Sequence, residues 1–386
     1  MPRLVVSTVG TSLLTNQIDV YTDSEEYFTH IQETANDREE EIKDKAKKTI
    51  IDLKIRADNS LYKAKNTKQI RDASAELNGI YGLYDGNLEQ GKSDIHWLIA
   101  TDTYQGQITA QIVKDFLDKE GITAYIQSPK KLSTLSTERF SYGIDELLEW
   151  WDATFLAYKD SHKIYFNLVG GFKALQGYVN TIGMLYGAEI IYIFEGNLEF
   201  ITIPRLPIHI DYSAIKPAQF ALMASKSVDI YIKVSELENV PDSLLSKAGD
   251  EATLNNWGHL LWNRCKRNFF TGDVPVGFPR LIYEDKSFIK DYQKNNVSEQ
   301  NKFDLHEVLT EVSASMIKFN GNTTRFDSRL HFTRYEGGQK CEGGVRKNQI
   351  DHFYIKNTGW RVSCITKDGN LYLRHYGEHD YVNDNP

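Results

Sequence analysis

Near the end of the chain, histidine, arginine and tyrosine recur at spacings that can bring them together. One short segment alternates as a β-strand does, with His352, Tyr354 and Lys356 on one face and Phe353 and Ile355 on the other. If the apolar pair faces a core, the polar trio is displayed on an open sheet face. Further residues of the same chemical types follow, namely Arg361, Arg374, His375, His379 and Tyr381.

These side-chain types suit cleavage of RNA without a metal. A base removes the proton of a 2′-hydroxyl, arginines stabilise the phosphorane, an acid protonates the 5′-oxygen, and aromatic rings stack on bases. A cationic surface sheet without activity is the competing interpretation. We expect His352 or His379 as base and acid, Arg361 and Arg374 on phosphate, Tyr354 or Tyr381 for stacking, and His375 in the same group.

A second set of polar residues follows three predicted strands in the first half of the chain, at residues 8–12, 101–106 and 167–173. The carboxyl ends of parallel strands meet at one edge of a sheet, where ligands bind. The sequence therefore predicts a pocket at that edge. The candidate ligand-binding residues are Thr8, Gly10, Thr11, Ser12, Asn16, Thr101, Asp102, Thr103, Gly106, Asn167, Gly170, Gly171, Phe172 and Lys173.

The third of these segments offers the most to a ligand. Gly170 and Gly171 let the backbone approach closely, and the N–H groups at the start of the next helix favour an anion such as phosphate. Lys173 adds a positive charge, and Asn167 offers an amide to a base or ribose. The segment matches neither the Walker nor the G-x-G-x-x-G pattern, and a plain strand–helix turn is the alternative. Because the three segments lack the His or carboxylate cluster of a dedicated hydrolase, we expect binding rather than chemistry.

Strands and helices alternate up to about residue 205, which predicts a doubly wound parallel sheet covered on both faces. Residues 24–77 form a charged helical stretch, as a solvated helix face would. The expected strands begin near Leu4, His96, Ile122, Ile164 and Glu189, and the expected helices cover 108–117, 144–158 and 175–186.

Two more domains are expected, so the fold class is multi-domain α/β with a doubly wound domain over 1–205. Prolines interrupt the chain near residue 206, and an apolar helical pattern follows, so 206–275 is predicted as a helical connector that a winged helix would also fit. Residues 276–386 predict an α+β domain of two helices and an antiparallel sheet. Its strands are expected at 330–335, 352–356, 361–366 and 371–374, with a hairpin turn at 367–370.

The composition is typical of a globular protein from a reducing compartment. The 386 residues carry a formal net charge of −8, yet residues 318–374 hold 11 basic and 5 acidic residues, as a localised RNA-binding face would. Three cysteines lack C-x-x-C spacing, and the sequence has neither a signal peptide nor an apolar run of membrane-spanning length. We expect a cytoplasmic protein with no membrane contact, metal or cofactor.

The polar segments of the first half resemble a known family. Val6–Ser12 with Asn16, Ala100–Gly106 and Asn167–Lys173 are similar to the three ligand loops of CARF domains, the Rossmann-like sensors of type III CRISPR effectors. Val169 stands where that family commonly has a threonine. The resemblance covers about residues 1–205 and implies a homodimer that binds one cyclic oligoadenylate across its two-fold axis. Cyclic tetra-adenylate is the expected ring, because a two-fold dimer matches an even number of units.

Residues 276–386 resemble the RelE family of mRNA-cleaving toxins, in which two helices pack on a small antiparallel sheet. His352 and Tyr354 fall where some members have lysines, and Arg361 falls on the family arginine. The ending, from Arg374 to Tyr381, is similar to RelE tails that place His, Arg or Tyr in the site. The resemblance implies an endoribonuclease that cleaves mRNA in the ribosomal A site.

Together the resemblances imply a CRISPR-associated mRNA interferase that a cyclic oligoadenylate activates, with mRNA and the ribosome as partners. One alternative is a CARF protein with a HEPN ribonuclease, whose R-x4–6-H motif belongs on a helix. The sequence has three literal matches, which all fall in predicted strand regions: Arg325 with His331, Arg346 with His352, and Arg374 with His379.

The other alternative is a ligand-sensing transcription regulator. In that case residues 206–275 would form a winged helix on DNA, and Arg264, Lys266 and Arg267 would face the duplex. Such a protein requires a concentrated basic recognition helix, and three residues are a small basic cluster.

Overall fold

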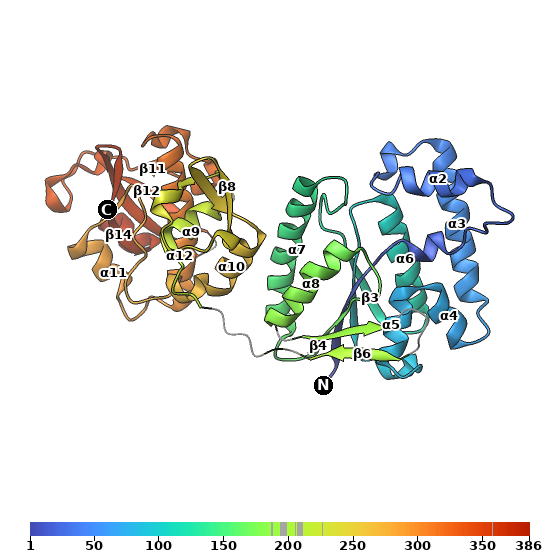
Figure 1. The fold of residues 1–386 in the computed structure, drawn as a ribbon. Coiled ribbons are helices and arrows are strands. Elements are labelled where there is room, and N and C mark those ends of the chain that lie inside the picture. Colours follow the sequence, from blue (N-terminus) through green and yellow to red (C-terminus); the bar gives the residue numbers. More distant parts are fainter. Residues whose placement is uncertain (187, 194–198, 205, 207–210, 226, 357) are drawn as a thin grey trace. The chain divides into compact units, whose positions relative to one another are not determined.

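The computed structural model describes residues 1–386 apart from 187, 194–198, 205, 207–210, 226 and 357 (Figure 1). The chain forms two compact units, residues 1–210 (unit 1) and 211–386 (unit 2). This division differs from the three predicted domains, because residues 211–275 belong to the second unit. Among the described residues, no helix has both the length and the apolar character needed to cross a membrane.

Unit 1 is built on a six-stranded sheet in the order β3-β2-β1-β4-β5-β6, parallel except for β6. In the central strand β1, Leu4 to Thr8 are all buried, as expected of a parallel strand covered on both faces. The strand order reverses between β1 and β4, and this reversal opens a crevice beyond their carboxyl ends. The strands are β1 (Arg3–Thr8), β2 (Ile95–Ile99), β3 (Thr123–Gln127), β4 (Lys163–Asn167), β5 (Glu189–Ile193) and β6 (Phe200–Ile203).

Helices cover both faces of this sheet, as the alternating pattern predicted. The helices α7 (Thr137–Tyr158) and α8 (Lys173–Tyr186) lie on one face, and α6 (Tyr104–Lys119) lies on the other with an inserted group of helices (Figure 1). On the first face, Trp151 of α7 packs on Phe166 of β4, with ring centroids 4.9 Å apart. The inserted helices are α1 (Ser12–Thr15), α2 (Glu25–Glu33), α3 (Asp44–Tyr62), α4 (Thr67–Ala73) and α5 (Ala75–Leu83).

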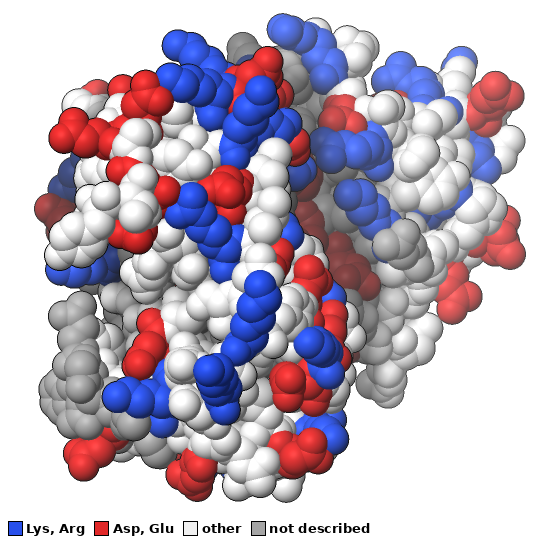
Figure 2. All heavy atoms as spheres, turned by 90° about the vertical axis from the view of Figure 1, so that its right-hand side faces the viewer, with Lys and Arg blue, Asp and Glu red and all other residues white. Residues whose placement is uncertain are grey.

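The charged helical stretch of the sequence is the outer surface of this insertion. Lysine and arginine alternate with aspartate and glutamate over the face that carries α2 and α3, without a patch of one sign (Figure 2). Exposed ion pairs such as Lys45 with Glu26, at 2.8 Å, link neighbouring helices there. The inner side of α3 is apolar, with Ile50 and Leu53 fully buried. These helices therefore present a solvated face, as predicted.

Unit 2 begins with two helices and a small antiparallel sheet of order β7-β9-β8. These elements pack with the rest of the unit: the Phe270 ring stacks on His306 at 4.9 Å, and Lys266 pairs with Glu307 at 3.0 Å. The apolar face of α10 is thus covered by α12, which is why 211–275 is no separate connector. The elements are α9 (Pro217–Met223), β7 (Ile232–Lys233), β8 (Leu245–Ala248), β9 (Glu251–Leu254) and α10 (Asn256–Phe270).

The remainder of unit 2 is an α+β arrangement around a sheet of order β10-β14-β13-β12-β11, in which β10 runs parallel to β14 and the other pairs are antiparallel. The predicted hairpin turn is confirmed: Lys367 pairs with Asn370, and Asp368 and Gly369 both have positive φ. The elements are β10 (Leu281–Tyr283), a π-helical turn (Asp285–Ile289), α11 (Lys290–Tyr292), α12 (Glu299–Lys318), β11 (Thr333–Arg334), β12 (Asp351–Ile355), β13 (Trp360–Lys367), β14 (Asn370–Glu378) and α13 (His379–Asp384).

The buried His306 makes unit 2 sensitive to acid. Its Nδ1 donates to the Lys302 carbonyl at 2.7 Å, and its Nε2 accepts the Val276 N–H at 3.0 Å, so both ring nitrogens are satisfied in the neutral form. Burial lowers the pKa of His306 to about 4. The unfolded chain takes up a proton below pH ~6.5, so stability present above that pH is lost as the pH falls toward 4, by on the order of 3 kcal/mol.

We predict that His306→Gln flattens the loss of unfolding free energy between pH 6.5 and 4, measured by urea denaturation at a series of pH values. Exposed His331 supplies the control, and His331→Gln should retain the wild-type slope. An unchanged slope in the His306 variant would show that other groups cause the acid sensitivity.

Candidate functional site

The loops after β1 and β4 touch each other at the carboxyl edge of the unit 1 sheet. The Thr8 hydroxyl donates to the Gly170 carbonyl at 2.5 Å. A Cβ added to Gly10 would lie 3.0 Å from the Gly171 nitrogen, and one added to Gly171 would lie 2.8 Å from the Thr8 Cβ. Gly171 also has a φ of +92°, which side chains rarely allow. The loops flanking the crevice are therefore held together by close backbone contact.

A buried carboxylate, Glu76 of α5, lies beneath both loops. Its Oε1 accepts the Gly10 N–H at 2.8 Å, and its Oε2 accepts the Ser74 hydroxyl at 2.9 Å. A Cβ on Gly170 would meet Oε1 at 2.0 Å. Burial raises the pKa of Glu76, and these hydrogen bonds offset only part of that effect. No sequence pattern distinguishes this residue, because it is one of many glutamates in a charged helical stretch.

Several predicted ligand residues are structural instead. Asn167 is buried, and its Nδ2 donates to the Ser7 hydroxyl and the Glu76 carbonyl, so the prediction that its amide reads a base or ribose is wrong. By strand alternation Asn167 shares a sheet face with Tyr165, and its amide points toward α5 on that face. Thr8, Thr103, Gly106 and Gly170 are also buried, and the Thr103 hydroxyl caps α6 by accepting the Gly106 N–H.

The other predicted residues remain at least partly exposed at this edge: Gly10, Thr11, Ser12, Asn16, Thr101, Asp102, Gly171, Phe172 and Lys173. Asp102 forms an ion pair with Arg38 and accepts the Lys131 N–H, so it is engaged within the chain. The Phe172 ring lies 5.8 Å from that of Phe140 in α7, which adds an aromatic wall. Lys173 is the first residue of α8 and is exposed. The edge thus offers hydroxyls, backbone N–H groups, a cation and aromatic rings.

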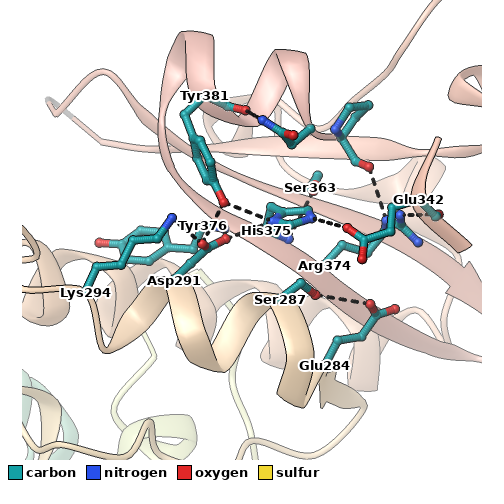
Figure 3. A network of polar contacts seen from close by, with 12 residues as sticks. Glu284, Ser287, Asp291, Lys294, Glu342, Ser363, Arg374, His375, Tyr376 and Tyr381 are labelled. Atoms are coloured by element: carbon teal, nitrogen blue, oxygen red, sulfur yellow. Dashed lines mark hydrogen bonds and ion pairs between the residues drawn. The ribbon is translucent and has the colours of Figure 1, made fainter.

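In unit 2, the buried Asp291 of α11 organises a polar network (Figure 3). Its Oδ2 accepts from His375 Nδ1 at 2.9 Å and from the Tyr376 N–H at 3.2 Å. Its Oδ1 accepts from the Tyr381 hydroxyl at 2.7 Å and lies 2.6 Å from Lys294 Nζ. Burial raises the pKa of Asp291, but the hydrogen bonds from His375, Lys294 and Tyr381 outweigh it, and the pKa lies below its ordinary value.

A β-bulge places Arg374 beside His375. Ser363 pairs with His375 and Cys364 with Leu373, so Arg374 is an extra residue in β14. Both side chains reach Glu342: Arg374 Nη2 donates to its carbonyl at 2.8 Å, and His375 Nε2 lies 3.7 Å from its Oε2 (Figure 3). Bulges of this kind re-aim side chains and recur next to active sites.

The second predicted group, around His352, is covered rather than displayed. The Tyr335 ring packs on His352 at 4.3 Å, and only 7% of His352 is exposed. Arg361 is 2% exposed and donates to Asn383 Oδ1 and the Tyr354 hydroxyl. The prediction of an open face is therefore wrong for these two residues. Tyr335, which follows β11, covers His352, and Asn383 of α13 contacts Arg361. Burial lowers the pKa of His352 to about 4.

The remaining predicted catalytic residues differ in exposure. Arg374 is buried, and its Nε donates to the Pro386 carbonyl, so its guanidinium already has two acceptors. His379 is exposed at the start of α13, with Nδ1 2.7 Å from Asp380 Oδ1. No sequence pattern predicted a role for Asp291, since a single aspartate in a short amphipathic helix is common on solvated surfaces. Among the described residues, no group of three or more His, Cys, Asp or Glu side chains is arranged to hold a metal.

The geometry bears on both alternatives. The histidine of the R-x4–6-H pair at 346–352 lies on β12, and the arginine of the pair at 374–379 lies on β14, whereas a HEPN motif requires a helix. On α10, Arg267 donates to Gln300 at 2.9 Å and lies over the Phe303 ring. Lys266 and Arg267 of α10 thus both contact α12, which disfavours a DNA-recognition helix.

Residues 71–206 match the model of a family described as CRISPR-associated protein (Cas_APE2256). The matched segment contains β2 to β6 and the loop after β4, and so includes one side of the crevice in unit 1. The match supports a CRISPR-associated protein.

We predict that Gly171→Ala lowers the unfolding free energy of unit 1 by about 1–3 kcal/mol, because the new Cβ meets Thr8 at a strained φ. The control is Gly177→Ala on the exposed side of α8, where nothing lies within 4 Å and alanine should stabilise the helix by about 0.5–1 kcal/mol. Chemical denaturation of both variants measures the difference. Equal effects would contradict the close contact between the two loops.

Proposed function

We propose that this protein is a CRISPR-associated RNA endonuclease whose activity depends on a cyclic oligoadenylate. The observation that carries the proposal is the family match over 71–206, which includes the β4 side of the crevice at the strand-order reversal. Unit 1 is the sensor and unit 2 is the ribonuclease. By resemblance to RelE, the substrate is mRNA on the ribosome.

The groups at the unit 1 edge suit a ring of adenosine phosphates. Lys173 and the first N–H groups of α8 attract phosphate, as helix starts do. Thr11 and Ser12 present hydroxyl groups to ribose and phosphate, and Phe172 offers a ring for stacking. In a two-fold homodimer, equivalent loops of both protomers face an even-membered ring, so cyclic tetra-adenylate is the proposed activator.

The side chains of unit 2 suit attack by a ribose 2′-hydroxyl. Histidines supply proton transfer, and Arg361 and Arg374 neutralise the phosphorane. In the structure both arginines bond to groups of the chain itself, namely Asn383 and Tyr354 for Arg361, and two carbonyls for Arg374. RNA phosphate replaces these neutral acceptors and forms stronger, charge-assisted bonds.

Activation requires only that the ligand prefer the active arrangement. A ligand that binds one conformation more tightly shifts the population toward it by its difference in affinity. The loops that meet the ligand are closely packed, so a small change there is transmitted rather than absorbed.

The direct test is cleavage of mRNA by purified protein, with and without cyclic tetra-adenylate and with and without ribosomes. Cutting only when both are present supports the full proposal. Ligand-dependent cutting of free RNA keeps the sensor and removes the ribosome. No cutting under any condition contradicts the ribonuclease assignment.

We predict that Lys173→Glu weakens binding of cyclic tetra-adenylate at least tenfold, because it replaces an attraction for phosphate with a repulsion. Isothermal titration calorimetry measures the affinity. The matched control is Lys159→Glu, an exposed lysine just after α7, near the start of β4 at the opposite edge of the sheet, and it should bind as the wild type does. Equal affinities in the two variants would remove Lys173 from the site.

A further inference from the structure

We propose that Asp291 is a positioning residue that orients His375 as the base of the RNA cleavage, an assignment that rests on the proposed function. The sequence leaves the base open between His352 and His379. The geometry favours a third histidine, because His375 has a buried carboxylate on one ring nitrogen and faces the protein surface loop at Glu342 with the other.

Asp291 is held in a single orientation. Each carboxylate oxygen has two partners: Tyr381 and Lys294 for Oδ1, and His375 and the Tyr376 N–H for Oδ2. Since these bonds keep the pKa of the Asp291 carboxyl low, the carboxyl stays ionised. It therefore accepts a hydrogen bond from Nδ1 of His375, which carries the proton. The neutral His375 ring then carries its free lone pair on Nε2, which is the atom that must accept a proton if His375 is the base and Asp291 orients it.

Nε2 of His375 is directed at a place where phosphate can bind. It lies 3.7 Å from Glu342 Oε2, and Glu342 also accepts from Arg374 through its carbonyl. The Glu342 side chain is 77% exposed, so it can move away from His375 without exposing buried apolar residues to water. RNA phosphate on Arg374 would therefore lie beside the accepting nitrogen. Five charged or titratable groups lie around His375. They are Asp291 on α11, Lys294 two residues after α11, Glu342, Arg374 on β14 and Tyr381 on α13.

His352 lacks these features. Its Nδ1 is buried without a hydrogen-bond partner among the residues that the structure describes, and its ring is covered by Tyr335. His379 contacts two residues of its own helix, Asp380 and the Asn383 amide, and the side chains of His379 and Asp380 are exposed. Neither ring is fixed by a buried carboxylate, so neither has its tautomer set in advance.

The chemical step is a transesterification. The 2′-hydroxyl gives its proton to Nε2 of His375 as the 2′-oxygen bonds to phosphorus, and the bond from phosphorus to the 5′-oxygen breaks with its electron pair on that oxygen. The 5′-oxygen takes a proton from the imidazolium of exposed His379. The products are a 2′,3′-cyclic phosphate and a 5′-hydroxyl, and exchange through water then carries a proton from His375 back to His379, which restores both side chains.

The test measures single-turnover cleavage by the full chain with saturating cyclic tetra-adenylate, on the RNA that the wild type cleaves, over a range of pH. His375→Ala should slow cleavage by about 10²-fold or more, and added imidazole should restore part of the rate. Asp291→Asn should also slow it by about 10²-fold and move the acid limb of the pH profile to lower pH, because an amide no longer favours the protonated ring. Asp285→Asn, on the exposed start of the same helical segment, should cleave as the wild type does.

A double-mutant cycle separates positioning from folding, since Asp291 also accepts a backbone N–H. If Asp291 acts through His375, Asp291→Asn has no further effect in the His375→Ala background. The same loss in both backgrounds, or a wild-type rate for His375→Ala, overturns this assignment while leaving the proposed function in place. Failure of the wild type to cleave any RNA overturns the proposed function itself, and this assignment with it.

Discussion

A buried carboxylate underlies the candidate site of each unit, and the surrounding structure has to satisfy it. An ion taken out of water is stable only with good partners. Glu76 has a backbone N–H and a hydroxyl as donors, and burial raises its pKa. Asp291 has Lys294 and His375 among its donors, and its pKa is lowered. The first carboxylate therefore acts mainly as an acceptor that fixes a loop, whereas the second is a fixed negative charge that orients an imidazole.

The local features of both units followed from the sequence, and the long-range ones did not. The apolar run at 4–8, the strand–turn–helix at 164–186 and the turn at 367–370 each depend on residues close together in the chain, and each is present. The inward amide of Asn167 depends instead on Ser7 and on the Glu76 carbonyl. The cover over His352 and Arg361 comes from Tyr335 and Asn383, which are distant in sequence and carry no periodic signal of their own.

The same limit explains the division of the chain. Prolines near residue 206 predict an interruption of regular structure, but no local pattern indicates which neighbour covers the apolar face of α10. That face packs on α12 through Phe270 and His306, so residues 211–275 became part of unit 2. A helix this amphipathic needs a partner surface, and the partner lies beyond the predicted boundary at 275.

Under the proposed function, the sensor site of unit 1 and the effector site of unit 2 differ in how much the chain must rearrange before a ligand binds. In unit 1, Lys173 is exposed and Thr11, Ser12 and Gly171 are partly exposed, so a ligand can reach them without displacing the chain. In unit 2, Arg361 and Arg374 are buried on acceptors of the chain itself. A substrate phosphate must first displace those acceptors, and the arginines regain the lost energy only when a charged group takes their place. A neutral ligand would gain nothing from this exchange. Under the proposed function, this exchange would favour a phosphodiester, and substrate binding would move the groups of residues 342 and 383 away from the two arginines.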